Sequence, residues 1–404
     1  MKNLIVAQSG GPTGAINASL AGVIDAALKC EEIDRIYGAR YGIQGVLNRD
    51  FVDLSEQVNT EEKISLLKVT PAMALGSCRM KLPELTQTEV YDQILSVFHQ
   101  YHVGYFVYIG GNDSMDTALK LSHYLSEKGE DIRVIGVPKT IDNDLAMTDH
   151  CPGFGSAAKF VATVVSEIVR DASVYNTPSV NIVEIMGRNA GWLTASAALV
   201  KCETGCAPQL IYLPEVVFDP ERFLEDIRRI QTKDKIVIAA VSEGVKVADG
   251  RYVSELAGDC NVDTFGHKYT SGAGKYLENL VSEKIGCKVR SIELNVLQRC
   301  SGHILSADDI DSAFAIGQAA VRAAVRGESG KMMTFLRADS DDYAYTVDMC
   351  DLELVANVER KFPTEWMNDT HNGVTEQAIR YLRPLIQGEV SVPKQNGLPA
   401  HMVL

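Results

Sequence analysis

The chain alternates short apolar runs with longer stretches of helical spacing, and this alternation constrains its fold more than any other feature. Residues between the apolar runs show the periodicity of amphipathic helices without internal breakers. This order is typical of crossover units with parallel strands. The sequence therefore predicts an α/β protein with largely parallel, doubly wound sheets. The predicted strands cover residues 4–7, 105–109, 134–137, 181–185 and 236–240, and the predicted helices cover residues 15–28, 114–125, 157–170 and 220–230.

A length of 404 residues is more than a single hydrophobic core usually organises, so we expect two lobes with an active-site cleft between them. The Pro152-Gly153 interruption precedes a new predicted helix. We place the first lobe at residues 1–153 and the second at residues 154–298. Residues 299–404 are predicted to be a return segment followed by a packed C-terminal extension.

Charge and cysteine usage exclude several classes of protein. The chain has 39 Lys and Arg against 53 Asp and Glu, a formal charge of −14, and a general nucleic-acid binder needs a basic surface. Its nine cysteines are scattered, which fits a reducing compartment better than a disulfide framework. The first apolar run is too short for a signal-peptide core or a membrane span. We therefore expect a cytoplasmic chain with neither nucleic acid nor a membrane as partner.

The segments that follow the predicted strands are unusually rich in glycine and polar residues. Ligands of open α/β sheets bind outside the carboxyl ends of the strands, which makes these loops the candidate site. Gly10 and Gly11 precede a helix whose N-terminus can hold an anion, although a tight turn would use the same glycines. Gly110 and Gly111 lead into Asn112-Asp113, which can bring the backbone close to a charged ligand or simply cap a helix.

The loop at residues 138–144 is the most informative of these segments. It places Lys139, Thr140, Asp142 and Asp144 directly after one strand. An alcohol that attacks phosphorus benefits from a carboxylate that accepts its proton and from cations on the phosphoryl oxygens. Asp142 is the candidate base, and Lys139 with Thr140 can hold the phosphoryl group.

Taken together and in order, the post-strand loops from residue 4 to about residue 326 resemble those of the phosphofructokinase family. Lys139 and Asp113 resemble its pyrophosphate-dependent branch, whereas members that use ATP have glycine at these positions. A carboxylate at Asp113 would lie where the α-phosphate of a nucleotide binds and would repel it. The resemblance makes residues 1–153 the pyrophosphate lobe and residues 154–298 the sugar-phosphate lobe.

The resemblance also implies a reaction and roles for individual residues. The reaction is reversible phosphoryl transfer from pyrophosphate to the 1-hydroxyl of fructose 6-phosphate, which gives fructose 1,6-bisphosphate and phosphate. Asp142 would be the general base, supported by Lys139, Asp113 and Asp144. Magnesium would be the cofactor, with Asn112 at the family's metal position, and the chain would form a homodimer or homotetramer. The implied substrate-binding residues are Gly11, Arg79, Thr140, Ile141, Met186, Gly187, Arg188, Glu243, Val296, Leu297, Gln298 and Arg299.

Three residues depart from the family pattern. Asn112 replaces an aspartate, Val296 replaces a sugar-binding histidine of ATP-using bacterial members, and Ser179 replaces an arginine that reaches in from a neighbouring subunit there. These departures leave two alternatives to the pyrophosphate-dependent enzyme. One is an ATP-dependent 6-phosphofructokinase, and the other is a non-catalytic regulatory subunit that binds sugar phosphate.

Overall fold

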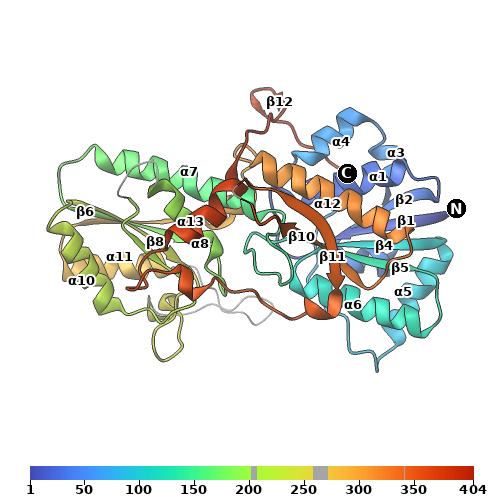
Figure 1. The fold of residues 1–404 in the computed structure, drawn as a ribbon, viewed down its shortest axis with the longest axis horizontal. Coiled ribbons are helices and arrows are strands. Elements are labelled where there is room, and N and C mark those ends of the chain that lie inside the picture. Colours follow the sequence, from blue (N-terminus) through green and yellow to red (C-terminus); the bar gives the residue numbers. More distant parts are fainter. Residues whose placement is uncertain (202–206, 258–271, 341) are drawn as a thin grey trace.

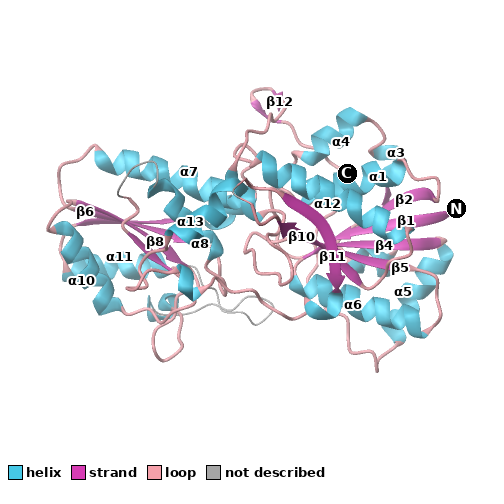
Figure 2. Ribbon diagram, viewed as in Figure 1, coloured by secondary structure: helices cyan, strands magenta, loops and turns pink. Residues whose placement is uncertain are grey.

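The computed structural model describes residues 1–201, 207–257, 272–340 and 342–404, which form two α/β lobes that lie side by side (Figure 1). Each lobe is built around its own sheet, with helices on both faces (Figure 2). The fold is the doubly wound α/β class that the alternating sequence pattern predicts. Within the described residues, no helix is both long and apolar enough to span a membrane.

The first sheet has seven strands in the order β11-β10-β5-β4-β1-β2-β3. The five inner strands run parallel, and the edge strands β3 and β11 pair antiparallel with their neighbours. Two of the seven strands come from the last quarter of the chain, so the return segment completes this sheet. The strands are β1 (Lys2–Gln8), β2 (Ile33–Ala39), β3 (Phe51–Asp53), β4 (Val103–Gly110), β5 (Arg133–Pro138), β10 (Lys331–Arg337) and β11 (Tyr345–Asp351).

Alternate residues of β1 enter separate cores on the two faces of this sheet, Leu4 and Val6 on one and Ile5 and Ala7 on the other. The first face is covered by α1 (Ile16–Leu28), α3 (Leu54–Gln57), α4 (Glu61–Lys68) and α12 (Ala307–Val325). The opposite face is covered by α2 (Ile43–Asn48), α5 (Glu89–Gln100) and α6 (Asn112–Glu127). The return segment therefore contributes a helix as well as strands to the first lobe.

The second sheet has four parallel strands in the order β7-β8-β6-β9. These are β6 (Ser179–Ile185), β7 (Leu210–Tyr212), β8 (Ile236–Ser242) and β9 (Lys288–Glu293). One face packs against α7 (Phe154–Ser173), α8 (Trp192–Ala195) and α13 (Glu376–Leu382), and the other packs against α10 (Pro220–Gln231) and α11 (Ala273–Lys284). Short 3₁₀ turns complete the described structure: η1 (Ser196–Val200), η2 (Val253–Ala257), η3 (Asn295–Arg299), η4 (Leu352–Leu354), η5 (Thr364–Trp366) and η6 (Arg383–Ile386).

The C-terminal extension, which follows β11, contacts both lobes. Val355 is buried in the core of the first lobe, and Phe362 is buried in the core of the second. After α13 the chain forms a small hairpin of β12 (Lys394–Gln395) and β13 (Leu398–Pro399). Met402 and Leu404 then pack against the first lobe. The extension is therefore packed, and it connects two hydrophobic cores.

All five predicted strands and all four predicted helices are present, as β1, β4, β5, β6 and β8 and as α1, α6, α7 and α10. The pattern missed β2, β3, β7, β9, β10, β11, β12 and β13, which are edge strands, short strands or strands with mixed burial. The divisions at residues 153 and 298 remain predictions. Residues 299–404 are shared between the lobes, because α12, β10 and β11 belong to the first lobe and α13 to the second.

Candidate active site

The loop at residues 138–144 follows β5 and is fixed by backbone contacts on both sides. The Lys139 amide donates to the carbonyl of Gly110 at 3.0 Å, so the loop lies against the end of β4. The Asp142 amide donates to Oγ1 of Thr140 at 3.0 Å, which closes a tight turn. Asn143 has a φ of 56°, a left-handed conformation that asparagine tolerates better than most residues. The sequence thus dictates a turn that presents Asp142 and Asp144 on either side of a buried asparagine.

This loop and the residues that follow it are anchored in the cores of both lobes. Ile141 packs in the core of the second lobe, whereas Leu145 and Cys151 pack in a core of the first. Asn143 is fully buried, and its Oδ1 accepts a 2.9 Å hydrogen bond from the Cys151 amide. The Ile141 side chain therefore packs in a core. The predicted substrate contact at this residue would have to be made by its backbone.

The titratable groups of this loop have pKa values that lie closer together than usual. Burial raises the pKa of Asp142, and the neighbouring charges of Asp144 and Glu243 raise it further. Burial also raises the pKa of Asp144. Burial lowers the pKa of Lys139 to about 8, against the opposing effect of the two carboxylates. Carboxylates and an amine perturbed in this way are typical of sites that transfer protons.

The first glycine loop lies against two of the predicted cations. A Cβ atom placed on Gly10 would lie 2.9 Å from Nζ of Lys139, and one on Gly11 would lie 3.4 Å from Nη1 of Arg299. Gly10 has a φ of 83°, which favours glycine. The hydroxyl of Ser77 donates to the Gly10 carbonyl at 2.6 Å, which draws the segment containing the exposed Arg79 alongside this loop.

The second glycine loop opens α6, and its two polar residues have different surroundings. Both ends of the Asn112 amide are engaged by the C-terminal extension: Nδ2 donates to the Val358 carbonyl at 2.7 Å, and Oδ1 accepts from the Asn357 amide. Asp113 is exposed and forms an ion pair with Lys81 at 2.8 Å. The metal contact at Asn112 stays a prediction. Lys81 was missed, and its only signal is its place two residues beyond Arg79.

The predicted sugar-binding residues of the second lobe meet at the carboxyl end of its sheet. Met186 donates its amide to Oε1 of Gln298 at 3.2 Å, and the Gly187 amide donates to Oε1 of Glu243 at 3.4 Å. A small pocket at this edge is lined in part by Met186 and Glu243. Arg188 is close enough to Asp142 to oppose the rise in its pKa.

The predicted residues on η3 divide into two kinds. Gln298 is buried, and Arg299 points toward Gly11 in the first lobe. Val296 and Leu297 expose about half of their residue surface, 48% and 54%. Nε of Arg188 and Nε of Arg299 are buried without a hydrogen-bond partner in the described part of the chain. Buried unpaired donors of this kind are uncommon, and a bound ligand would satisfy both of them.

The described residues contain no cluster of three or more His, Cys, Asp or Glu side chains that could hold a metal ion. Mg²⁺ often binds through one or two carboxylates together with substrate phosphates and water, so a protein cage is not required. Asp144, whose pKa burial raises, fits this mode because a cation would relieve the cost of ionising a buried carboxyl group. The carboxylate of Asp144 suits a metal better than the neutral amide of Asn112 does.

The fold and these loops define an α/β phosphotransferase, and comparison with known proteins gives its family. The family model described as Phosphofructokinase matches residues 3–324, so the chain belongs to the phosphofructokinase family.

Relatives named "Pyrophosphate--fructose 6-phosphate 1-phosphotransferase" resemble the chain over nearly its whole length. The protein from Methylococcus capsulatus is 39% identical over 100% of this chain and 96% of its own, and the protein from Halomonas elongata is 40% identical over 98% and 94%. The crystal structure of a pyrophosphate-dependent phosphofructokinase from Nitrosospira multiformis matches with a TM-score of 0.89 and 39% identity, covering 99% of this chain and 96% of that one. The likeness therefore extends beyond residue 324 into the C-terminal extension.

Proposed function

We propose that this chain transfers a phosphoryl group reversibly from pyrophosphate to the 1-hydroxyl of fructose 6-phosphate, giving fructose 1,6-bisphosphate and phosphate. The observation that carries the proposal is the buried Lys139, whose ammonium lies against the Gly10 loop while Asp142 and Asp144 follow on the same turn. The full-length likeness to enzymes named for this reaction supports the same choice of donor and acceptor.

Asp142 acts as the general base. It accepts the proton of the sugar hydroxyl as the hydroxyl oxygen forms its bond to phosphorus, and the bond from phosphorus to the bridging oxygen of pyrophosphate breaks. The electron pair of that bond leaves on orthophosphate. The raised pKa of Asp142 brings it nearer to neutral pH, where a base both ionises and takes up a proton effectively.

Lys139 and Arg299 bind the phosphate groups beside the first glycine loop. Lys139 faces the Gly10 loop and stabilises charge on the transferred phosphoryl group, because a buried cation acts strongly in a low-dielectric site. Arg299 lies next to Gly11, and its planar fork suits a phosphate held in two hydrogen bonds. Thr140, Met186, Gly187, Arg188, Glu243 and Gln298 complete the acceptor side.

The proposal includes Mg²⁺, which would be held by Asp144 together with substrate oxygens, whereas Asp142 stays free to accept the proton. Bound there, it would neutralise charge on the pyrophosphate oxygens. A homodimer or homotetramer in the cytoplasm completes the proposal, on the basis of the family resemblance.

Donor choice provides the decisive test. Initial rates with pyrophosphate and with ATP, each with fructose 6-phosphate and the purified chain alone, should show turnover with pyrophosphate at least about tenfold faster, a difference of 1.4 kcal/mol. Equal or better turnover with ATP would reject the donor assignment. No turnover by the chain alone, with sugar phosphate still bound, would support a regulatory subunit.

Two substitutions at Asp113 separate repulsion from steric exclusion. Asp113→Asn removes the charge and keeps the volume, whereas Asp113→Gly removes both. If the carboxylate excludes the nucleotide by its charge, both variants should gain activity with ATP relative to pyrophosphate. A gain in Asp113→Gly alone would assign the exclusion to size, and no gain in either would leave Asp113 without a part in donor choice.

A further inference from the structure

The C-terminal extension contains a short segment, residues 357–362, that touches both lobes and the loop at residues 138–144. We call that loop the catalytic loop. We call this segment the strap. Its first residues hold the Asn112 amide at the start of α6, in the first lobe. Its last residue, Phe362, is buried in the core of the second lobe, and the Phe362 amide donates to Oε1 of Glu215 at 2.9 Å. The strap therefore connects the lobes beside the loop that holds Asp142.

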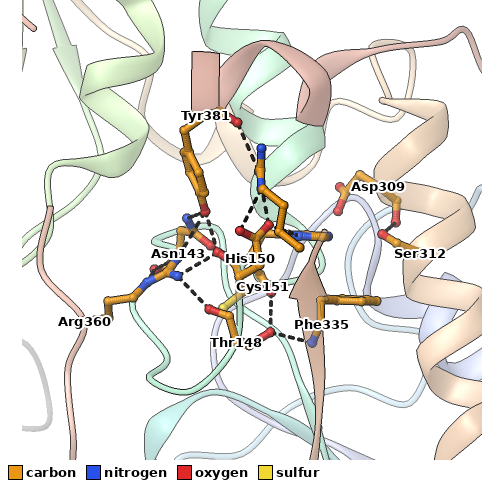
Figure 3. Close-up of polar contacts among 11 residues, drawn as sticks. Asn143, Thr148, His150, Cys151, Asp309, Ser312, Phe335, Arg360 and Tyr381 are labelled. Atoms are coloured by element: carbon orange, nitrogen blue, oxygen red, sulfur yellow. Dashed lines mark hydrogen bonds and ion pairs between the residues drawn. The ribbon is translucent and has the colours of Figure 1, made fainter. Parts of the chain in front are cut away.

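Arg360, in the middle of the strap, binds the backbone of the catalytic loop and of the residues that follow it, up to Asp149. Its Nη2 and Nε donate to the carbonyl of Asn143 at 3.0 and 3.2 Å. Its Nη1 donates to the carbonyls of Thr148 and Asp149, both at 2.6 Å. The Arg360 amide donates to the carbonyl of Asp144 at 2.7 Å. Figure 3 shows the guanidinium reaching toward Asn143 and Thr148.

These partners are unusual for an arginine, because they are all neutral. No carboxylate among the described residues forms an ion pair with Arg360. Its charge is instead satisfied by backbone carbonyls and by the hydroxyl of Tyr381, which accepts from Nη2 at 3.4 Å. A fork of five donors can hold several carbonyls in a fixed geometry, and a lysine cannot reproduce it. The arrangement therefore fixes the path of the backbone at residues 143–149.

The other side of Arg360 faces the second lobe. Its guanidinium carbon lies 4.6 Å from the centre of the Trp192 ring, and Nε1 of Trp192 donates to the Arg360 carbonyl at 3.1 Å. Next to it, Glu359 accepts a 2.8 Å hydrogen bond from Asn189, which follows the predicted sugar-binding residues 186–188. The position of the catalytic loop is thus tied to the sugar side of the site.

Tyr381, on α13, reinforces the same turn. Its hydroxyl accepts from Nδ2 of Asn143 at 2.9 Å and donates to the carbonyl of Asp149. Asn143 stands between Asp142 and Asp144 and has a left-handed backbone. Arg360 and Tyr381 thus hold the residue that separates the two catalytic carboxylates (Figure 3).

We infer that Arg360 is a positioning residue for phosphoryl transfer: it fixes the backbone of residues 143–149 so that Asp142 and Asp144 keep their place opposite Lys139. The inference rests on the proposed function, in which Asp142 is the base. Arg360 lies beyond residue 324, where the match to the family model ends. The strap therefore adds a catalytic support from outside the matched region.

Arg360→Lys tests the inference, because it keeps the charge and removes the fork. We expect kcat to fall about tenfold to a hundredfold, since small displacements of reacting groups cost rates of this order. The KM values for both substrates should change by less than about threefold, because a misplaced base affects mainly the transition state. Methylguanidine added to Arg360→Ala should restore part of the lost kcat.

Arg337→Lys is the matched control. Arg337 also contacts this region, but it binds the Asp149 carboxylate at 2.9 and 3.1 Å and the Tyr381 carbonyl at 3.2 Å, not the carbonyl of Asn143. The Arg337→Lys variant should lower Tm as much as Arg360→Lys does, but it should lower kcat less than Arg360→Lys does. If both variants lose the same Tm and Arg360→Lys keeps the kcat of the wild type, the inference is overturned. Arg360 would then have only a structural role.

Two further variants keep the test decisive. If Arg360→Lys does not fold, Tyr381→Phe removes only the hydroxyl, and a kcat lowered at least about threefold would support the inference whereas an unchanged kcat would overturn it. Asp142→Asn separates the two proposals. If Asp142→Asn keeps its activity, Asp142 is not the base. If Asp142→Asn is inactive while Arg360→Lys has the kcat of the wild type, only the positioning role of Arg360 is rejected.

Discussion

Gly10 and Lys139 lie so close that a Cβ atom on Gly10 would be 2.9 Å from the lysine Nζ. The two residues are far apart in sequence, and their contact joins the glycine loop after β1 to the catalytic loop after β5. The absence of a side chain at Gly10 therefore allows the ammonium group to reach the place where we propose that the transferred phosphoryl group binds.

Gly10→Ala should displace Lys139 and slow turnover. We expect kcat with pyrophosphate to fall about tenfold or more, because the cation would no longer meet the charge that develops in the transition state. Steady-state kinetics measure this. Gly250→Ala is the control, since Gly250 has a similar φ of 85° but nothing within 4 Å of a Cβ atom. Similar losses of activity in both variants would assign the effect to backbone strain.

The dependence of kcat/KM on pH should be bell-shaped. Asp142 must be ionised, and burial raises its pKa, so the acidic limb should lie above the ordinary aspartate range. Lys139 must be protonated, and burial lowers its pKa to about 8, so activity should fall as the pH rises past that value. Lys139→Arg should move the alkaline limb upward, because arginine stays protonated. An unmoved limb would assign that ionisation to another group.

Asp142→Asn should stabilise the fold while abolishing turnover. Burial raises the pKa of Asp142 above its unfolded value, so the folded state favours the neutral form. The contribution of Asp142 to stability is therefore full below the unfolded pKa and is lost as the pH rises through the folded pKa. At about pH 8 the variant should melt at least about 2 °C above the wild type, and the gap should narrow toward about pH 5.

Thermal melts across this range, with the exposed Asp339→Asn as control, measure the effect of Asp142→Asn. A wild type that is more stable than the variant at high pH, by a margin that grows with pH, would show that the folded state favours the ionised carboxylate. The control should leave the pH dependence of Tm unchanged, because Asp339 lies at the surface.

Much of the fold and part of the site could be predicted because the signals are local. Apolar runs and helical periodicity predicted β1, β4, β5, β6 and β8 together with the helices α1, α6, α7 and α10. The rule that ligands bind at the carboxyl ends of strands then selected the loops that hold Gly11, Asp142 and Arg188. The structure places Lys139 beside Gly10 and Arg299 beside Gly11, so loops chosen separately do meet.

Other features depend on how distant segments pack. The loop at residues 138–144 predicted a catalytic carboxylate, but it contained no sign that Ile141 is buried in the core of the second lobe. Asn112 looked like a metal position, and only the structure shows its amide engaged by residues of the extension. Lys81 pairs with Asp113 although neither neighbourhood has a pattern that predicts the contact.

The sequence by itself determined the α/β class, the strands β1, β4, β5, β6 and β8, and the chemistry of the loops that follow them, because these features follow from nearest neighbours and from periodicity. Only the tertiary structure decided what holds the catalytic loop in place. Arg360 binds carbonyl oxygens of residues more than two hundred positions earlier. Backbone carbonyls are the same in every residue, so a contact made to them leaves no mark in the sequence.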